Sequence, residues 1–259
     1  MRPLLHVDQV KKSFLQPNQK LFGRKQNHII RDVSFSLYQG ECLGIVGESG
    51  SGKSTLGKLI LGLEKPDSGK VLFDNIDIHQ RQGRHLTVRK NISAVFQDYH
   101  ASVNPYFTVE QIIAEPIDIY EKLSSAMKKE RIHQLLEQVG LNSSFYHRYP
   151  HKISGGQLQR VCIARAIACA PKFILFDEAV SSLDISVQAQ ILSLLAQLQQ
   201  QLNLTSIFIT HDLTTVTYLC DRVMFFYQGR IIEHINPISN LSNVKHAYSK
   251  QLLQSVLGF

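Results

Sequence analysis

The feature that most constrains this chain is a glycine-rich turn between an apolar segment and a segment that can form a helix. The flanking segments, residues 41–46 and 55–61, predict a buried strand before the turn and a helix after it. Glycines allow backbone N–H groups to curl around an anion, and the N-terminus of a helix adds partial positive charge. The turn fits the phosphate-binding pattern G-x-x-x-x-G-K-[ST], with the sequence Gly47-Glu48-Ser49-Gly50-Ser51-Gly52-Lys53-Ser54. The sequence therefore predicts a site for the phosphates of a nucleotide.

Two side chains of this turn have the chemistry that a bound nucleotide requires. The ammonium group of Lys53 would reach the β- and γ-phosphates, and the hydroxyl of Ser54 would hold Mg²⁺. A short pattern of this kind also occurs by chance, and the strand and helix around it reduce that chance. If the turn binds a nucleotide, the rest of the chain must supply the other groups that such a site needs.

Length and composition indicate a globular protein with enough chain for a packed core. The 259 residues suffice for one large domain, or for a core with a subdomain, and 44% of them are hydrophobic and 19% charged. No run of about 18 apolar residues occurs, so no transmembrane helix is expected. Residues 1–8 are too few and too polar for a signal peptide, and we therefore expect a cytoplasmic protein.

Neither the charge nor the cysteines point to a further ligand. The formal net charge is +7, but the basic residues are scattered along the chain. A solvated basic surface explains this pattern, while a nucleotide, an anionic lipid or a nucleic acid remain alternative partners. The cysteines lack C-x-x-C spacing, which predicts buried reduced thiols in place of a zinc site or a disulfide framework. They are Cys42, Cys162, Cys169 and Cys220.

Strands and helices alternate along most of the chain. After a first strand at residues 3–10 and a polar insertion at 15–28, alternating apolar residues predict a strand over 29–37. Later strands are expected at 91–96, 172–177 and 204–210, and later helices at 157–169, 186–201 and 212–220. This order predicts an α/β fold with a mainly parallel sheet, followed by a hairpin around Gln228-Gly229. The tail from Pro237 is weakly patterned.

A helical insert interrupts this alternation. Residues Thr108 to Gln111 fit a capping box, which marks the start of a helix. Apolar residues with helical spacing follow and stop before Gly140; they are Ile132, Leu135, Leu136 and Val139. We therefore expect a core formed by residues 1–97 and 156–236, a helical subdomain over 98–155 and a C-terminal tail over 237–259.

Two carboxylates follow a buried apolar strand. Asp177 and Glu178 end the segment that begins at Phe173. Parallel strands bring their C-terminal ends to the edge of the sheet where ligands bind. Asp177 suits Mg²⁺ opposite Ser54, and Glu178 suits a base that orients or deprotonates the attacking water. The alternative is an ordinary strand end followed by a helix cap.

Three further residues and one segment could complete a nucleotide site. The segment Ser154-Gly155-Gly156-Gln157 is either a loop with a helix cap, or an anion site for a nucleotide that another subunit binds. His211 could bond a γ-phosphate and position water, although a histidine in such a place is usually structural. Gln97 offers a neutral oxygen to Mg²⁺ or water, with a surface glutamine as the alternative. Phe14 could stack on an adenine ring or pack in the core.

In their order along the chain, these motifs resemble those of the nucleotide-binding subunit of an ABC transporter. The resemblance covers about residues 4–235 and rests on GESGSGKS, Gln97, SGGQ, FILFDE, Ser182-Leu183-Asp184 and His211. It implies an ATPase that uses ATP and Mg²⁺. It also implies a P-loop NTPase (RecA-like) α/β core with a mainly parallel sheet, an N-terminal antiparallel β subdomain and an α-helical subdomain insert.

The resemblance implies a role for each matching residue. Phe14 would stack on the adenine, and the phosphates would lie on the loop from Gly47 to Thr55. Mg²⁺ would be held by Ser54, Gln97 and Asp177. Glu178 would be the catalytic base, His211 the switch histidine and Asp184 a D-loop residue. The signature that contacts ATP on an opposing subunit would be Ser154, Gly155, Gly156 and Gln157, preceded by Ile153 where a leucine is usual.

The resemblance also implies an assembly. Two homologous nucleotide-binding subunits would form a head-to-tail dimer, with ATP between the loop of one and the signature of the other. Two membrane-spanning permease subunits and an external solute-binding protein would complete an importer. This chain would lie at the cytoplasmic face of the inner membrane as a peripheral subunit, and no nucleic-acid partner is expected.

Several segments resemble the peptide/nickel importer group within this family. They are residues 102–105, the insertion at 15–28 and the tail segment 246–253. Ala179 stands where peptide importers usually carry proline, and in this respect the chain resembles the nickel-import ATPases more closely. We therefore expect it to power the uptake of nickel or a nickel chelate, with a dipeptide or oligopeptide as the alternative cargo.

Other classes of ATPase share these motifs but differ in organisation. A chromosome ATPase would insert a long coiled coil between Gln97 and Ser154, and the sequence shows no sustained heptads there. A ribosome-acting factor would carry two cassettes in one chain, and an exporter would commonly be fused to membrane helices. The sequence thus favours an importer subunit.

Overall fold

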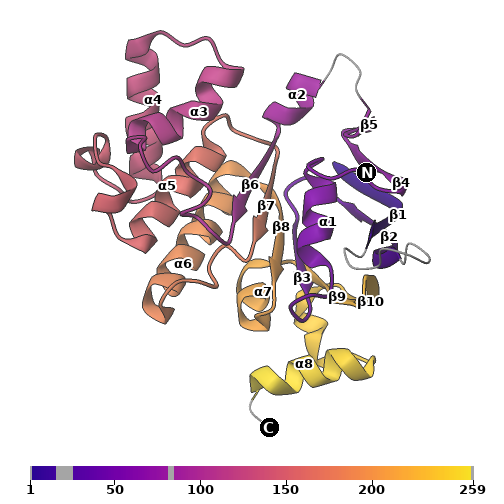
Figure 1. The fold of residues 1–259 in the computed structure, drawn as a ribbon. Helices are drawn as coiled ribbons and strands as arrows, with labels where there is room; N and C mark the ends of the chain where they lie inside the picture. The colour runs from indigo at the N-terminus through magenta and orange to yellow at the C-terminus, as the bar shows by residue number, and fades with distance from the viewer. Residues whose placement is uncertain (1, 16–25, 81–84, 258–259) are drawn as a thin grey trace. The chain divides into compact units, whose positions relative to one another are not determined.

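The computed structural model describes residues 2–15, 26–80 and 85–257, and forms two compact units (Figure 1). The first unit comprises Met1–Gln82 and Thr205–Phe259, and the second comprises Gly83–Leu204. The insertion predicted at residues 15–28 lies largely outside the described residues. The division that the sequence predicts, with a helical subdomain over 98–155, stays a prediction.

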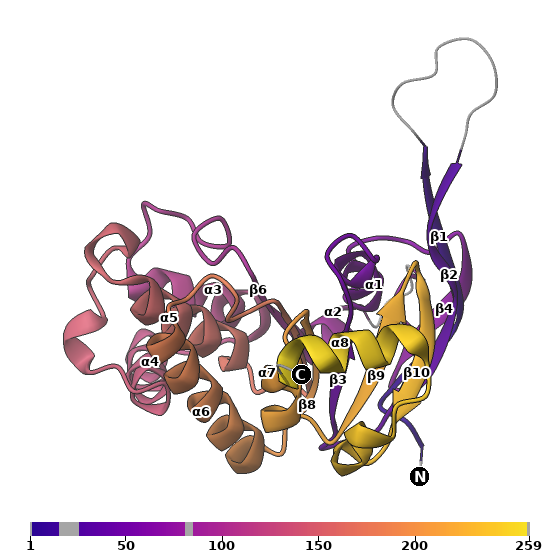
Figure 2. The same ribbon diagram turned by 90° about the horizontal axis from the view of Figure 1, so that it is seen from below.

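An antiparallel sheet forms the N-terminal part of the first unit, with strand order β2-β1-β4-β5. Its two long strands run side by side as a ribbon (Figure 2). The predicted alternation is confirmed, because Val33, Phe35 and Leu37 are buried while Asp32 and Ser34 are exposed. The strands are β1 (Leu5–Leu15), β2 (Gln26–Leu37), β4 (Ser68–Phe73) and β5 (Ile76–Asp77).

A second sheet of the first unit holds the strand that leads into the glycine-rich turn. In this unit its strand order is β10-β9-β3-β8, and β3 runs parallel to both of its neighbours. Every residue of β3 and β8 is buried, which explains why both strands are apolar runs without alternation. The strands are β3 (Cys42–Val46), β8 (Thr205–Thr210), β9 (Arg222–Tyr227) and β10 (Arg230–Ile235), and β9 and β10 form the predicted hairpin.

The helices of the first unit include one that the sequence pattern did not predict. Helices α1 (Lys53–Ile60) and α7 (Leu213–Leu219) follow β3 and β8 as expected. The weakly patterned tail contains a short 3₁₀ segment, Ile238–Asn243, and helix α8 (Ala247–Leu257). In Figure 1, α8 lies beyond the end of β3 from which the glycine-rich turn departs. The weak pattern arises because α8 buries few side chains along its length.

The second unit combines a parallel strand pair with five helices in its described part. The strands are β6 (Ile92–Phe96) and β7 (Phe173–Asp177), paired from Ile92↔Phe173 to Phe96↔Asp177. The helices are α2 (His85–Lys90), α3 (Val109–Tyr120), α4 (Ser125–Gln138), α5 (Gly155–Ile167) and α6 (Ile185–Leu202). The helical spacing predicted within α4 is confirmed, because Ile132, Leu135 and Leu136 are fully buried.

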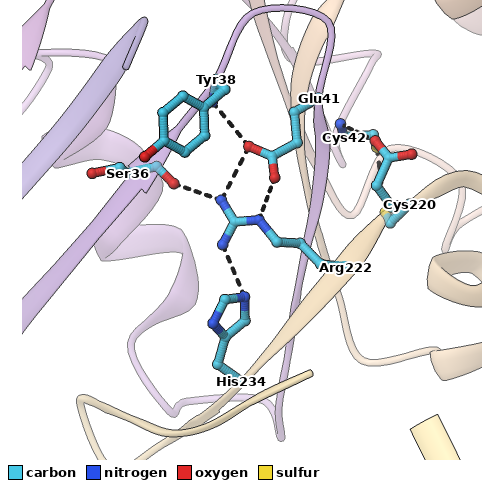
Figure 3. A network of polar contacts seen from close by, with 8 residues as sticks. Ser36, Tyr38, Glu41, Cys42, Cys220, Arg222 and His234 are labelled. Carbon is cyan, nitrogen blue, oxygen red and sulfur yellow. Dashed lines mark hydrogen bonds and ion pairs between the residues drawn. The ribbon is translucent and has the colours of Figure 1, made fainter. Parts of the chain in front are cut away.

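A largely buried ion pair lies in the first unit at the end of β3 opposite the glycine-rich turn (Figure 3). The guanidinium of Arg222 donates to the Glu41 carboxylate and to the Ser36 carbonyl, and its Nη1 lies 3.0 Å from His234 Nε2. An arginine can only donate, so His234 must accept through an unprotonated nitrogen. Burial, together with the Arg222 charge, lowers the pKa of His234 and favours this neutral form. The network ties β2, β9 and β10 to the residue that precedes β3.

The four cysteines are buried and carry free thiols. Those of Cys42 and Cys220 lie 3.3 Å apart between their sulfur atoms, next to this network. Among the described residues, no helix combines the length and the apolar character that a membrane span requires.

Candidate nucleotide-binding site

The candidate site residues form two groups, one in each unit. The first unit holds Phe14, the glycine-rich turn and His211, and the second holds Gln97, the signature segment, Asp177, Glu178 and Asp184. Within the first unit, strand pairing places the glycine-rich turn beside His211, and within the second it places Gln97 beside Glu178.

The glycine-rich turn links β3 directly to α1, as the sequence predicts. Gly52 precedes the helix with a left-handed φ of 108°, and a Cβ there would lie 2.9 Å from the carbonyl oxygen of Ile29. Gly47, at the start of the turn, leaves no room for a side chain, because a Cβ would lie 2.1 Å from the Phe226 carbonyl oxygen. The backbone of the turn is thus packed against neighbouring strands, and its curl depends on glycine.

Polar groups of the turn form a donor set suited to an anion. Lys53 is 4% exposed, and its Nζ donates to the carbonyls of Gly47 at 2.6 Å and Glu48 at 2.8 Å. The hydroxyl oxygen of Ser51 is buried and has no hydrogen-bond partner in the described structure. A turn that holds an unsatisfied buried hydroxyl and an ammonium group can accommodate an anion. The turn therefore fits the phosphates of a nucleotide.

His211 lies at the same edge of the sheet as this turn. The last residue of β3, Val46, pairs with the last residue of β8, Thr210, so Gly47 and His211 leave adjacent parallel strands side by side. Asp212 then caps α7 by accepting the N–H of Thr214 at 2.8 Å. Burial raises the pKa of Asp212, but hydrogen bonds from Thr215 and Thr214 outweigh this and leave it below its ordinary value. The anionic cap fixes the turn that carries His211.

Phe14 lies in β1 and is 40% exposed. The ammonium nitrogen of Lys12 is 5.1 Å from the centre of this ring. An exposed ring of this kind is more compatible with stacking on a base than with a place in the core. No contact given for the described residues joins Phe14 to the phosphate loop, so its adenine role stays a prediction.

The two carboxylates and Gln97 meet at the end of the paired strands in the second unit. Because Phe96 pairs with Asp177, Gln97 and Glu178 follow adjacent parallel strands. Glu178 adopts a φ of 48°, which is uncommon for a residue with a side chain and costs about 1–3 kcal/mol. Strain of this kind is typical of functional positions, because the surrounding structure must hold the residue in place. The Ala179 carbonyl beyond it accepts a 2.6 Å hydrogen bond from Gln159.

The signature segment forms the start of α5. Ser154 and Gln157 make a capping box, in which each side chain bonds to the other's backbone N–H. Gly155 has no room for a side chain unless Tyr99 moves, because a Cβ would lie 2.5 Å from the Tyr99 hydroxyl. Within the described part of the chain, the N–H groups of Gly155 and Gly156 are given no acceptor. A helix start with free N–H groups is suited to a negatively charged ligand.

Asp184 lies at the start of α6, where its side chain makes no capping hydrogen bond. The neighbouring residues 181–186 are exposed apart from half-buried Leu183, and Ile185 is 87% exposed. An apolar side chain with this exposure, next to an uncommitted carboxylate, is compatible with a surface that contacts another protein.

Sequence reasoning missed a contact between the turn and the C-terminal tail. The backbone N–H of Glu48 donates to the hydroxyl of Tyr248 at 2.8 Å. The partners are separated by 200 residues, and the tail shows no pattern that points to the turn. No sequence signal at Tyr248 identifies it as part of the site.

Known proteins resemble this chain in both sequence and structure. The ABC transporter family model matches residues 30–181. The oligopeptide transport ATP-binding protein OppF of Bacillus subtilis strain 168 is 44% identical over 258 residues, which covers 98% of this chain and 82% of OppF. The metal-staphylopine import system ATP-binding protein CntF of Staphylococcus aureus strain Mu50 is 43% identical over 256 residues, with 99% and 100% covered.

Among solved structures, a dimeric post-hydrolysis state of the ATP-binding cassette MJ0796, bound to ADP and Pi, has the same fold. Its TM-score is 0.78 at 29% identity, with 90% of this chain and 98% of that chain covered. The predicted fold, an α/β cassette with N-terminal antiparallel strands and a helical subdomain, is thereby confirmed. Together, the motifs and these similarities show that the chain is an ATP-binding domain of the ABC transporter family, in the group that includes OppF and CntF.

Proposed function

We propose that this chain hydrolyses Mg·ATP as one of two paired cassettes and thereby powers the import of an oligopeptide across the cytoplasmic membrane. The observation that carries the ATPase part is the phosphate loop, whose buried Lys53 and unpartnered Ser51 hydroxyl suit a bound phosphate. ATP binding and hydrolysis are also the activity of the family.

The chain's own residues divide the work of hydrolysis. Lys53 and the N–H groups of the loop neutralise the charge that develops on the γ-phosphate. Glu178 holds the attacking water and takes its proton, and His211 orients the phosphate and the water. Ser54, Gln97 and Asp177 are oxygen-bearing side chains of the kind that Mg²⁺ prefers, and the ion would neutralise further phosphate charge. Phe14 stacks on the adenine.

The signature and the D-loop act on a second cassette. The free N–H groups of Gly155 and Gly156 suit the γ-phosphate of an ATP that the partner holds, and Ser154 and Gln157 fix the helix start that presents them. The exposed surface around Asp184 and Ile185 suits the contact between subunits. The description of MJ0796 as a dimer with ADP and Pi supports a pair of cassettes, and the head-to-tail arrangement is part of the proposal.

A cleft of about 820 Å³ in the second unit suits the membrane-spanning permease subunits. Its lining includes Ala94, Phe107, Ile119 and Arg165, and Ile119 is 66% exposed. A protruding apolar segment of a permease would cover this surface and place the chain at the cytoplasmic face of the membrane. An external solute-binding protein would deliver the cargo. Replacing Ile119 with glutamate should abolish uptake and preserve basal ATP hydrolysis, and undiminished uptake would contradict this docking site.

A cassette does not contact the cargo, so the cargo is inferred from the relatives of the chain. Oligopeptide transport proteins of two bacterial species resemble the chain at 43–45% identity, which supports a peptide. A metal chelate is the second candidate, since CntF is similar at 43% identity over nearly the whole chain. The nickel importer expected from Ala179 becomes a special case of this second candidate.

The test of the ATPase proposal is the Glu178→Gln variant. We expect it to bind ATP with the affinity of the native chain, to lose turnover by about 100-fold or more, and to accumulate as a closed dimer in size-exclusion chromatography. The matched control is Glu137→Gln on the exposed face of α4, which should behave as the native protein. Normal turnover of Glu178→Gln would remove Glu178 from the role of base.

The cargo is tested by deleting the chain in its native cell and complementing it with the native form or with Glu178→Gln. If the cargo is an oligopeptide, growth on a peptide as sole source of a required amino acid should depend on the active form, and ⁶³Ni accumulation should not. The opposite result would favour the metal-chelate candidate. Dependence of neither would contradict both cargo proposals.

A further inference from the structure

The C-terminal helix is hydrogen-bonded to the phosphate loop through Tyr248. Tyr248, in the first turn of α8, is 7% exposed, and its hydroxyl accepts the N–H of Glu48 at 2.8 Å. This N–H belongs to the peptide group between Gly47 and Glu48. The carbonyl of the same peptide group, on Gly47, accepts the Lys53 Nζ at 2.6 Å.

The geometry of a peptide group links these two hydrogen bonds. A peptide group is planar, with its N–H and C=O pointing in opposite directions, so fixing the direction of one fixes the other. Tyr248 therefore sets the direction in which the Gly47 carbonyl holds the ammonium of Lys53. A Cβ on Gly47 would strike the Phe226 carbonyl oxygen, so this peptide is also confined by β9.

Tyr248 is itself held firmly by the hairpin strands. Its ring lies against the ring of Tyr227, the last residue of β9, with 4.3 Å between the ring centres. The carboxylate of Glu233 in β10 accepts the backbone N–H groups of Lys245 at 2.6 Å and His246 at 3.2 Å, just before α8. Contacts to the ring of Tyr248 and to the backbone just before it therefore fix the position of its hydroxyl. Burial raises the pKa of Tyr248, so this hydroxyl keeps its proton.

We propose that Tyr248 is a positioning residue of the phosphate loop, through which helix α8 sets the place of Lys53 and hence the affinity for ATP. The inference rests on the proposed function in one respect, namely that the loop binds ATP. It adds that the C-terminal tail is part of the nucleotide site, although it carries none of the nucleotide-binding motifs.

The neighbouring tyrosine provides a matched control. The hydroxyl of Tyr227 accepts a hydrogen bond from the side-chain amide of Gln228 at 3.0 Å. Within the described residues, this hydroxyl makes no hydrogen bond to the phosphate loop. Tyr248→Phe and Tyr227→Phe each remove one hydroxyl from the same pair of packed rings and keep both rings. Only the first removes the acceptor of the Glu48 N–H.

The experiment measures ATP dissociation constants, turnover and thermal midpoints of the full chain in both variants. Tyr248→Phe should weaken ATP binding by roughly 2- to 10-fold, the range expected for one hydrogen bond. Its Glu48 amide should also lose protection against hydrogen exchange. Tyr227→Phe should match the native chain in its affinity for ATP and in the protection of the Glu48 amide. Native ATP affinity in Tyr248→Phe, or equal weakening in Tyr227→Phe, would overturn the inference.

A second variant tests whether the effect passes through the helix. Glu233→Gln replaces the carboxylate that fixes the start of α8 and leaves the loop untouched. We expect it to weaken ATP binding in the same direction, and the double variant with Tyr248→Phe to be no weaker than Tyr248→Phe alone. Additive losses would show that Glu233 does not act through Tyr248. If the native chain itself bound no ATP, the proposed function would fail. The outcomes that test Tyr248 are instead differences between variants of a chain that does bind ATP.

Discussion

Two helices of the second unit begin with the same motif, and only one of them has the character of a ligand site. Thr108 before α3 and Ser154 before α5 share a φ of −71° and a ψ of 163°, and each forms a capping box with a glutamine three residues on. The N–H to glutamine distances are 2.8 Å and 2.9 Å. Local sequence has therefore produced the same helix start twice.

The difference lies in the two N–H groups that the capping box does not satisfy. At α3, the N–H of Val109 donates to the Arg148 carbonyl at 2.8 Å, and that of Glu110 to the Tyr146 carbonyl at 3.0 Å. At α5, the equivalent residues are Gly155 and Gly156, whose N–H groups are given no acceptor in the described structure. A capping box alone thus does not create an anion site. The site requires N–H groups that the rest of the protein leaves free.

The largest effect that separates the two helix starts is expected from arginine at the cap. Ser154→Arg should lower ATP turnover by about 100-fold or more, because its side chain would cover the N–H groups meant for the partner's γ-phosphate. Binding of ATP to the chain's own loop should persist. The control, Thr108→Arg, should keep turnover within about twofold. Phosphate release at saturating ATP measures the turnover of both variants. Equal losses would contradict the view that only the start of α5 is a ligand site.

The next largest difference between the two helix starts is expected from alanine at the first helical position, Gly155 in α5 and Val109 in α3. Gly155→Ala should lower turnover by about tenfold with little change in stability, since its Cβ would lie beside the N–H groups and push aside the half-buried Tyr99 side chain, whose hydroxyl would be 2.5 Å away. Adding Tyr99→Phe, which removes the clashing hydroxyl, should restore part of the activity. Val109→Ala should leave turnover nearly unchanged. It should lower the unfolding free energy by about 2 kcal/mol, because Val109 is fully buried. Denaturant unfolding and steady-state turnover together decide the comparison, and a stability loss in Gly155→Ala would count against it.

Alanine at either cap should have a smaller effect that the two sites share. Ser154→Ala and Thr108→Ala should each lower the unfolding free energy by about 1 kcal/mol, since each removes one capping hydrogen bond. Only Ser154→Ala should also reduce turnover. A cap whose removal left stability unchanged in urea unfolding would show that the tertiary contacts alone hold that helix start.

The smallest effect is a loss of stability at alkaline pH, and it is expected only near α3, where Tyr146 lies. Burial, with a further contribution from Glu110, raises the pKa of Tyr146 to about 12. The unfolded chain releases this proton near pH 10, so the stabilisation from Tyr146 is complete below pH 10 and is lost as the pH rises towards 12. Tyrosinate absorbance should therefore show a late step, and Tyr146→Phe should reduce it by the contribution of one tyrosine, while Tyr248, whose pKa is also raised, should still contribute. Tyr149→Phe, at an exposed position, should leave that step in place, and its disappearance there would contradict the assignment.

Much of the fold could be predicted because its determinants are local in the sequence. The strand before Gly47, the capping boxes and the buried face of α4 each depend on residues a few positions apart, whose periodicity or spacing sets their conformation. The predicted site residues were identified in the same way, from short motifs at strand and helix ends. Helix α8 was missed because its contacts with the rest of the unit are few and far apart in the sequence.

The sequence by itself determined that this chain has a phosphate loop, two carboxylates after a buried strand and two similar helix starts. The tertiary structure alone decided which of these groups remain available to a ligand. Arg148 and Tyr146 satisfy the N–H groups of α3 from about 36–39 positions away in the chain, and Tyr248 reaches the loop from a distance of 200 residues. The physical reason is that a hydrogen-bonding group is free or occupied according to its neighbours in space, and a linear motif does not specify them.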